Sequence, residues 1–204
     1  MKKGLRLCGA ISLFCVLSVL SACNPKVSLA KNIEGTWATN SEILAGIDAL
    51  NASSVEMLQF IPTDGVSNPL SGDFTHSIIV DVATIAPQSD SVVQPYSVTV
   101  TAIASVQGSW SVIDDDEIRL TLDPKTFNVS VNPSEVVQED NILTGKNFSV
   151  VDSIMPELSA RIKRMITPVV QGRLNVNKID DIHILKGTEM RCEINDRNYT
   201  FFMQ

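Results

Sequence analysis

Residues 96–107 read YSVTVTAIASVQ, and this stretch decides the fold class. Apolar residues occupy every second position from Tyr96 to Val106, and serine or threonine fills most positions between them. Successive side chains of a β-strand point to opposite faces, so a period of two with β-branched residues is typical of a strand with one buried face. We therefore expect a long strand here.

The same alternation recurs on both sides of this stretch. It is found at residues 55–61, 74–82, 118–122 and 127–131. Turn-forming residues separate these runs, among them Thr63-Asp64-Gly65 and Asp123-Pro124-Lys125. Strands joined by tight turns predict an antiparallel, mainly β domain in which neighbours in sequence pair with each other.

The pattern changes at Pro133. Residues 134–150 are polar and irregular, and apolar residues at helical spacing then predict a helix near Ser153–Thr167 that Pro168 should end or kink. Strand signals return at 174–176, 182–185, 190–194 and 199–203. We therefore expect a helical insertion at about 134–172 before the closing strands, and a further short helix at Ser41–Leu50.

The N-terminus has the features of an export signal. Basic residues precede an apolar run from Leu7 to Leu20, which is shorter than the roughly 20 residues of a membrane span. Leu20-Ser21-Ala22-Cys23 resembles the lipobox of bacterial lipoproteins. The resemblance implies that residues 1–22 form a signal peptide, that the Cys23 sulfur carries a diacylglycerol, and that acyl chains such as palmitate attach the protein to a membrane. Residues 23–32 then read as a polar tether, followed by a single β domain at 33–204.

The same resemblance places the protein in the bacterial cell envelope. Residues 24–28 lack the acidic cluster that resembles a surface-export signal. We therefore expect the domain to be anchored in the outer membrane and to face the periplasm, with exposure at the cell surface as the alternative.

Charge and cysteine content narrow the function classes. The net charge of −7 argues against nucleic-acid binding by electrostatics. With Cys8 and Cys15 in the leader and Cys23 acylated, only Cys192 remains, so no intramolecular disulfide is expected. Cys192 alternates with Met190 and Ile194, which predicts a buried thiol.

Gly35-Thr36-Trp37 is similar to the Gly-X-Trp start of lipocalins, and Phe60-Ile61-Pro62-Thr63-Asp64-Gly65 is similar to a turn of lipocalin-like lipoproteins. The resemblance implies an up-and-down barrel in which Trp37 plugs one end and packs on an arginine such as Arg191. A β-sandwich with Trp37 as a core aromatic is the alternative. An eight-stranded barrel, as in lipocalins, holds side chains or one small ligand in its interior. The candidate lining residues are Phe74, Ile78, Val98, Val100, Ala102 and Trp110.

No motif nominates a catalytic residue, a metal ligand or a cofactor site. His76 shares a strand face with Phe74 and Ile78, and His183 lacks metal-ligand spacing, so both read as structural. The acidic run at 114–117 lies between two strand signals and reads as a solvated turn. Ser91 and Ser153 stand in Asp-Ser-aliphatic triplets that resemble an O-glycosylation signal of exported proteins.

The sequence thus predicts a lipid-anchored, lipocalin-like domain that binds a small apolar ligand without catalysis. The alternative is an envelope interaction module that contacts another envelope protein and takes no small ligand.

Overall fold

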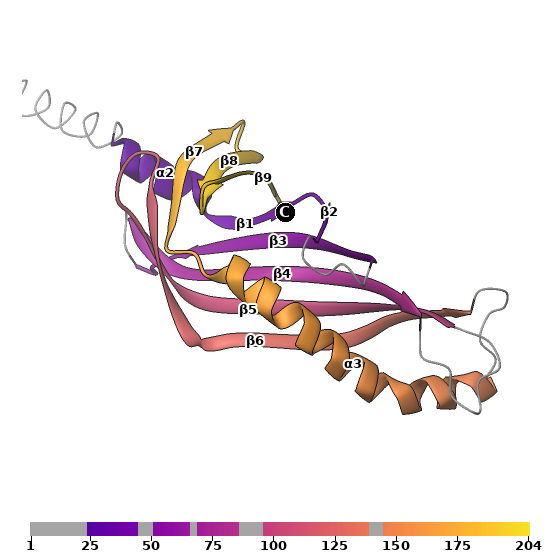
Figure 1. Cartoon of the computed structure of the whole chain (residues 1–204). Coiled ribbons are helices and arrows are strands. Elements are labelled where there is room, and N and C mark those ends of the chain that lie inside the picture. The colour runs from indigo at the N-terminus through magenta and orange to yellow at the C-terminus, as the bar shows by residue number, and fades with distance from the viewer. Residues whose placement is uncertain (1–23, 45–50, 66–68, 86–95, 139–144) are drawn as a thin grey trace, which may run out of the picture.

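The computed structural model describes residues 24–44, 51–65, 69–85, 96–138 and 145–204. Nine strands and two helices lie in this part of the chain (Figure 1). The strands are β1 (Gly35–Thr39), β2 (Glu42–Ile43), β3 (Asn51–Pro62), β4 (Ser71–Ile85), β5 (Tyr96–Val112), β6 (Ile118–Gln138), β7 (Lys178–Leu185), β8 (Glu189–Ile194) and β9 (Arg197–Met203). The helices are α2 (Pro25–Ile33) and α3 (Gly145–Leu174).

The strands form one antiparallel sheet that closes in a ring. From β3 to β9 each strand pairs with its neighbours in sequence, and β1 pairs with both β9 and β3. Strand β2 continues along β3 after β1. The predicted mainly β, antiparallel arrangement is therefore confirmed.

The ring is weakest between β6 and β7. These two strands pair only at Ile118–Ile179 and Arg119–Lys178, and the Leu120 amide donates one more hydrogen bond, of 2.8 Å, to the Asn177 carbonyl. Past this point the long strands β3 to β6 continue away from β7, β8 and β9, and α3 runs beside them (Figure 1). Helix α3 packs against β4, β5 and β6, so it covers the side on which the ring is open.

Two hydrophobic clusters fill the interior. The first, at the end where the ring closes, holds the large aromatic side chains of Trp37, Phe60, Phe74, Trp110 and Phe201. The second lies between α3 and the long strands. It includes Ile78, Val80, Val100, Ala102, Leu158, Ile162 and Ile166. The apolar faces predicted for the strands and for α3 thus bury each other.

The segment expected to be a tether is helix α2. The Asn24 side chain accepts a hydrogen bond of 3.1 Å from the Lys26 amide, and Pro25 occupies the first turn, where a missing N–H costs nothing. Leu29, Ala30 and Ile33 are buried against the closed end. The short apolar face, hidden in a polar sequence, makes α2 part of the domain.

The helical insertion also differs from its predicted limits. Strand β6 continues to Gln138 because residues 133–138 still pair with β5, and α3 continues through Pro168 to Leu174. Pro168 is on the exposed side of α3. There the lost backbone hydrogen bond leaves a carbonyl that water can reach, and the Thr167 hydroxyl donates to the Lys163 carbonyl at 2.6 Å.

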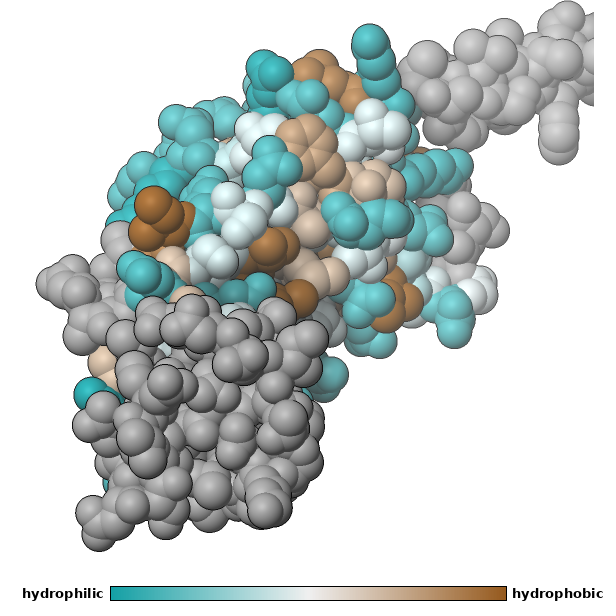
Figure 2. Space-filling view, turned by 90° about the vertical axis from the view of Figure 1, so that its right-hand side faces the viewer, coloured by the Kyte–Doolittle hydropathy of each residue, from teal (hydrophilic) through white to brown (hydrophobic). Residues whose placement is uncertain are grey.

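Other parts of the prediction meet the edges of the described chain. Glu42 and Ile43, expected in a short helix, form β2, and residues 45–50 lie outside the described part. None of the described helices is both long and apolar enough to cross a membrane. The part of the described surface that Figure 2 shows is mostly hydrophilic along its border, with hydrophobic residues in small groups between.

Candidate functional site

A groove opens where β6 separates from β7. It has a volume of about 540 Å³, within the range of about 300–1,000 Å³ that is usual for small-molecule sites. Strands β5 and β6 form one wall and the last turns of α3 form the other. The lining residues are Val106, Leu122, Pro124, Phe127, Pro168, Gln171, Gly172, Leu174 and Asn175. Most of these side chains are apolar, and the amides of Gln171 and Asn175 are the polar exceptions.

A β-bulge shapes the wall made by the strands. The pairing of β5 with β6 shifts between Ser105 and Gln107, which leaves Val106 without a register partner in β6. Opposite it lies Asp123-Pro124-Lys125, predicted to be a turn between strands but found inside β6. Proline cannot donate to a ladder and is tolerated at bulges, so the strand bends here instead of ending.

Side-chain hydrogen bonds hold the bulge. The Gln107 amide donates to the Thr126 hydroxyl oxygen at 2.8 Å, and that hydroxyl lies 2.7 Å from the Asp123 carbonyl. The Lys125 amide donates to the Asp123 carboxylate at 3.0 Å. These contacts fix the outer rim of the groove, so the strand wall is built before any ligand arrives.

The wall made by α3 is open at Gly172. A Cβ atom built on Gly172 meets no atom within 4 Å. The same residue borders a second hollow, of about 620 Å³, whose other walls include Ile43 of β2 and Arg197 of β9. Glycine is unfavourable inside a helix, and here it leaves space beside both hollows.

The residues predicted to line a ligand cavity do not come together in one place. Phe74 and Trp110 pack in the closed-end cluster. Ile78, Val100 and Ala102 pack under α3. The side chain of Val98 lies outside the described part of the structure.

Trp37 and Arg191 also lie apart. Trp37 is fully buried, and its indole N–H donates to the Ile33 carbonyl at 2.8 Å, which joins α2 to the closed end. Arg191 points outward because its neighbours Met190 and Cys192 point inward, and it pairs with Glu189 at 2.8 Å. Arg191 is therefore not the partner of Trp37.

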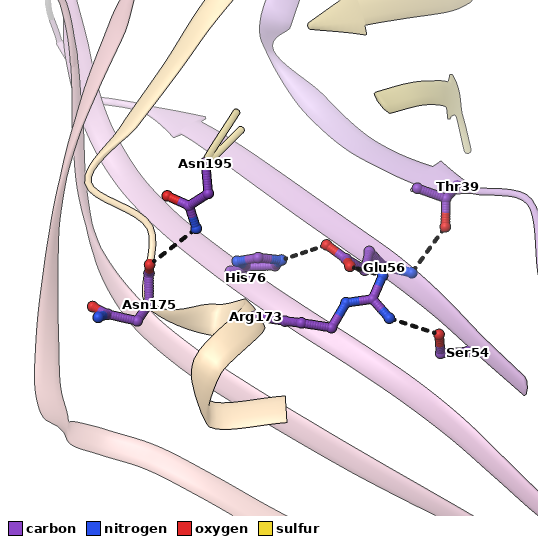
Figure 3. Close-up of polar contacts among 7 residues, drawn as sticks. All are labelled: Thr39, Ser54, Glu56, His76, Arg173, Asn175 and Asn195. Atoms are coloured by element: carbon purple, nitrogen blue, oxygen red, sulfur yellow. Dashed lines mark hydrogen bonds and ion pairs between the residues drawn. The ribbon is translucent and has the colours of Figure 1, made fainter. Parts of the chain in front are cut away.

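A buried polar cluster lies along the strands between the two hydrophobic clusters, since His76 is flanked on β4 by Phe74 of one and Ile78 of the other. Figure 3 shows its contacts. Its centre is Glu56 of β3, of which 2% is exposed. The His76 Nε2 atom is 3.3 Å from one Glu56 carboxylate oxygen, and the Arg173 guanidinium forms an ion pair with the other. Arg173 also donates to the Ser54 hydroxyl at 3.3 Å. The cluster joins the C-terminal end of α3 to β3 and β4.

Two nitrogen atoms of the cluster have no hydrogen-bond partner among the described residues: His76 Nδ1 and Arg173 Nε. The backbone around Glu56 is nevertheless fixed, since its amide donates to the Thr39 hydroxyl at 3.0 Å. His76 is fully buried, so no substrate can reach it in this conformation. We therefore read the cluster as an attachment of α3 to the sheet.

Sequence reasoning placed His76 on an inner face but missed its partners. Glu56 is in phase with Leu58 and Phe60, so the alternation of β3 could have identified an inward carboxylate. Arg173 lies beyond the predicted end of the helix, and nothing in the local sequence connects it with Glu56.

The prediction for Cys192 is confirmed. The thiol is buried with Met190 and Ile194 in the closed-end cluster. Burial, with a smaller effect of the nearby Glu56 carboxylate, raises the pKa of Cys192 to about 12. The thiol is therefore protonated at neutral pH, and a thiolate nucleophile is not present.

Several other candidates are placed without forming a site. His183 is exposed on β7, and the acidic residues at 114–117 lie in the connection between β5 and β6. Among the described residues no three His, Cys, Asp or Glu side chains are grouped to hold a metal ion. Cys23 and Ser91 lie outside the described residues, as does the side chain of Ser153.

Comparison with known proteins adds no family: no family model and no curated protein matches the chain.

Proposed function

We propose that the protein is a lipid-anchored lipoprotein of the bacterial envelope that binds a small apolar molecule without catalysing a reaction. The groove between α3 and strands β5 and β6 carries this proposal, because it is apolar, of suitable volume and lined by residues held in place by the fold. The ligand site is thus assigned beside the ring, at the opening between β6 and β7, where Leu122 and Phe127 line it together with Leu174.

The ring itself supports a lipocalin-like architecture. Strands β3 to β9 follow one another in sequence order, β1 closes the ring, and Trp37 is buried at the closed end. Insertion of α3 between β6 and β7 departs from ordinary lipocalins. The helix covers the interior of the open half, and this leaves the groove at its edge as the place for a ligand.

The anchor follows from the lipobox at Leu20–Cys23. Each methylene of an acyl chain that enters a bilayer contributes about 0.8 kcal/mol, so two or three chains hold the domain at the membrane. The outer membrane, with the domain facing the periplasm, is the location that we propose.

Binding of the neutral apolar dye Nile red tests the ligand site. We expect saturable fluorescence enhancement with the wild-type protein and at least a tenfold weaker response with Gly172→Leu, which fills the groove from the helix side. Because Gly172 also borders the second hollow, Ile43→Trp is the matched control: Ile43 is exposed and lines only that hollow. Equal binding by all three proteins, or none by the wild type, would contradict the proposal.

A further inference from the structure

The apolar groove adjoins a hollow that carries positive charge. This third hollow, of about 490 Å³, is distinct from the one beside Ile43, and it is lined by Ala160, Lys163, Arg164, Thr167 and Pro168. Pro168 also lines the groove. The two spaces therefore meet at this residue, with apolar walls on one side and two cationic side chains on the other.

Helical geometry places one of these cations next to the groove, one helical turn before its α3 wall. Pro168, Gln171 and Gly172 of α3 line the groove and form one stripe of the helix. Arg164 is four residues before Pro168 and so continues this stripe by one turn, or about 6 Å. Arg161 is on the same side one further turn away. The apolar groove thus leads along α3 toward arginine side chains.

These cations are exposed in a chain that is acidic overall. Arg161, Lys163 and Arg164 are all exposed, and none forms an ion pair with a carboxylate of the described residues. On the opposite rim, Asp123 and Lys125 flank Pro124, and their charges offset each other. The described lining of this hollow therefore carries two cationic side chains and no carboxylate.

We propose that the groove takes a single-chain amphiphile with a carboxylate head, that is, a monomeric fatty acid. The acyl chain lies against Leu122, Phe127 and Leu174, and the carboxylate lies over Pro168 near Arg164 and Lys163. This inference depends on the proposed function, because it names the ligand class of the same groove.

The charge and the apolar surface have separate roles. Burial of the acyl chain against the apolar walls provides most of the affinity. Exposed cations contribute little each, so two of them should favour a carboxylate head over a neutral one by about three- to tenfold. Added salt should reduce that preference, because solvent-exposed charges are screened.

Competition with Nile red tests the inference. Dodecanoate, below its critical micelle concentration, is compared with the neutral monoglyceride of the same chain, on the wild type and on the double variant Lys163→Gln/Arg164→Gln. We expect dodecanoate to displace the dye at three- to tenfold lower concentration from the wild type. In the double variant the preference should vanish, while the affinities for the monoglyceride and for Nile red stay the same. Acetate, which has the head without the chain, should not compete.

The outcomes separate the two proposals. Failure of Nile red to bind the wild type would overturn both. Dye binding without any preference for dodecanoate would overturn the carboxylate head alone and leave the apolar site. A third outcome would assign the cations to a membrane surface and overturn the monomer site. In that outcome dodecanoate does not displace the dye, and phosphatidylglycerol vesicles bind the wild type and Gly172→Leu equally well.

Discussion

His76 and Glu56 are diagonal neighbours on the inner face of β4 and β3, with Nε2 of the histidine 3.3 Å from a carboxylate oxygen of the glutamate. Arg173 reaches the other oxygen from α3. The carboxylate is thus the common partner of a histidine and an arginine. Because a helix joins a sheet only through side chains, the ion pair of Glu56 with Arg173 helps to fix the C-terminal end of α3, and with it one wall of the groove.

Replacement of this carboxylate should destabilise the domain strongly. Glu56→Gln leaves the Arg173 guanidinium partly buried without its counterion, and breaking such a pair costs about 3–5 kcal/mol. We expect a loss of this size in the free energy of unfolding measured with urea. Glu157→Gln, an exposed position on α3, is the control and should change it by less than about 0.5 kcal/mol.

A double-mutant cycle with Arg173→Gln separates the ion pair from other effects. The sum of the losses in unfolding free energy of the two single variants should exceed the loss of the double variant by about 1–3 kcal/mol. The reason is that the second substitution removes the charge that the first left unpaired. Additive losses would show that Arg173 and Glu56 do not stabilise each other.

The buried thiol makes stability depend on alkaline pH. Burial raises the pKa of Cys192 to about 12, whereas the unfolded chain loses this proton near its ordinary value of about 9. The folded protein therefore keeps a proton that the unfolded chain has released, and stability falls as the pH rises from about 9 toward 12. The free energy of unfolding, measured with urea across this pH range, should fall more steeply for the wild type than for Cys192→Ala. Parallel dependence on pH in the two proteins would contradict burial of the thiol.

Substitution by alanine should have opposite effects on stability at two glycines. A Cβ at Gly72 would lie 1.9 Å from the Ile61 carbonyl oxygen and 2.8 Å from the Trp110 indole nitrogen, so Gly72→Ala must move backbone and lower the melting temperature. Gly172→Ala meets open space in a helix and should raise stability by about 0.5–1 kcal/mol. Thermal unfolding by circular dichroism compares them, and similar shifts would be inconsistent with this packing.

A single substitution tests the proposed lipid anchor. Cys23→Ser removes the sulfur that the proposed lipobox offers for acylation, so the variant should lose its acyl mass and move from the membrane pellet to the soluble fraction. Mass spectrometry and fractionation of the two proteins measure this. Continued pelleting of an unacylated chain would indicate a different mode of attachment.

The strand pattern could be predicted because it is local. Alternation along residues 100–106 and 118–120 predicted strands with the inner faces that the structure has, and the same reasoning placed Cys192 and His76 inside. The bulge at Val106 could not be foreseen, because Pro124 signals a turn until its neighbours are known. Helix α2 was missed because three buried side chains in a polar segment give a weak periodicity.

The candidate site was harder to predict because it depends on distant contacts. The sequence favoured a cavity inside the ring, but α3 packs over Ile78, Val100 and Ala102. The groove brings residue 106 of β5, residues 122–127 of β6 and residues 168–175 of α3 together, and no local pattern relates these three segments. The same holds for Glu56 and Arg173.

Native mass spectrometry of the protein extracted from its own membranes tests the central claim most directly. We expect the wild type to carry, above the mass of the acylated chain, one noncovalent apolar ligand that collisional activation releases, and we expect Gly172→Leu to be acylated but empty. A wild-type protein that is acylated and bare, or a variant that retains the same ligand, would contradict the assignment of the groove.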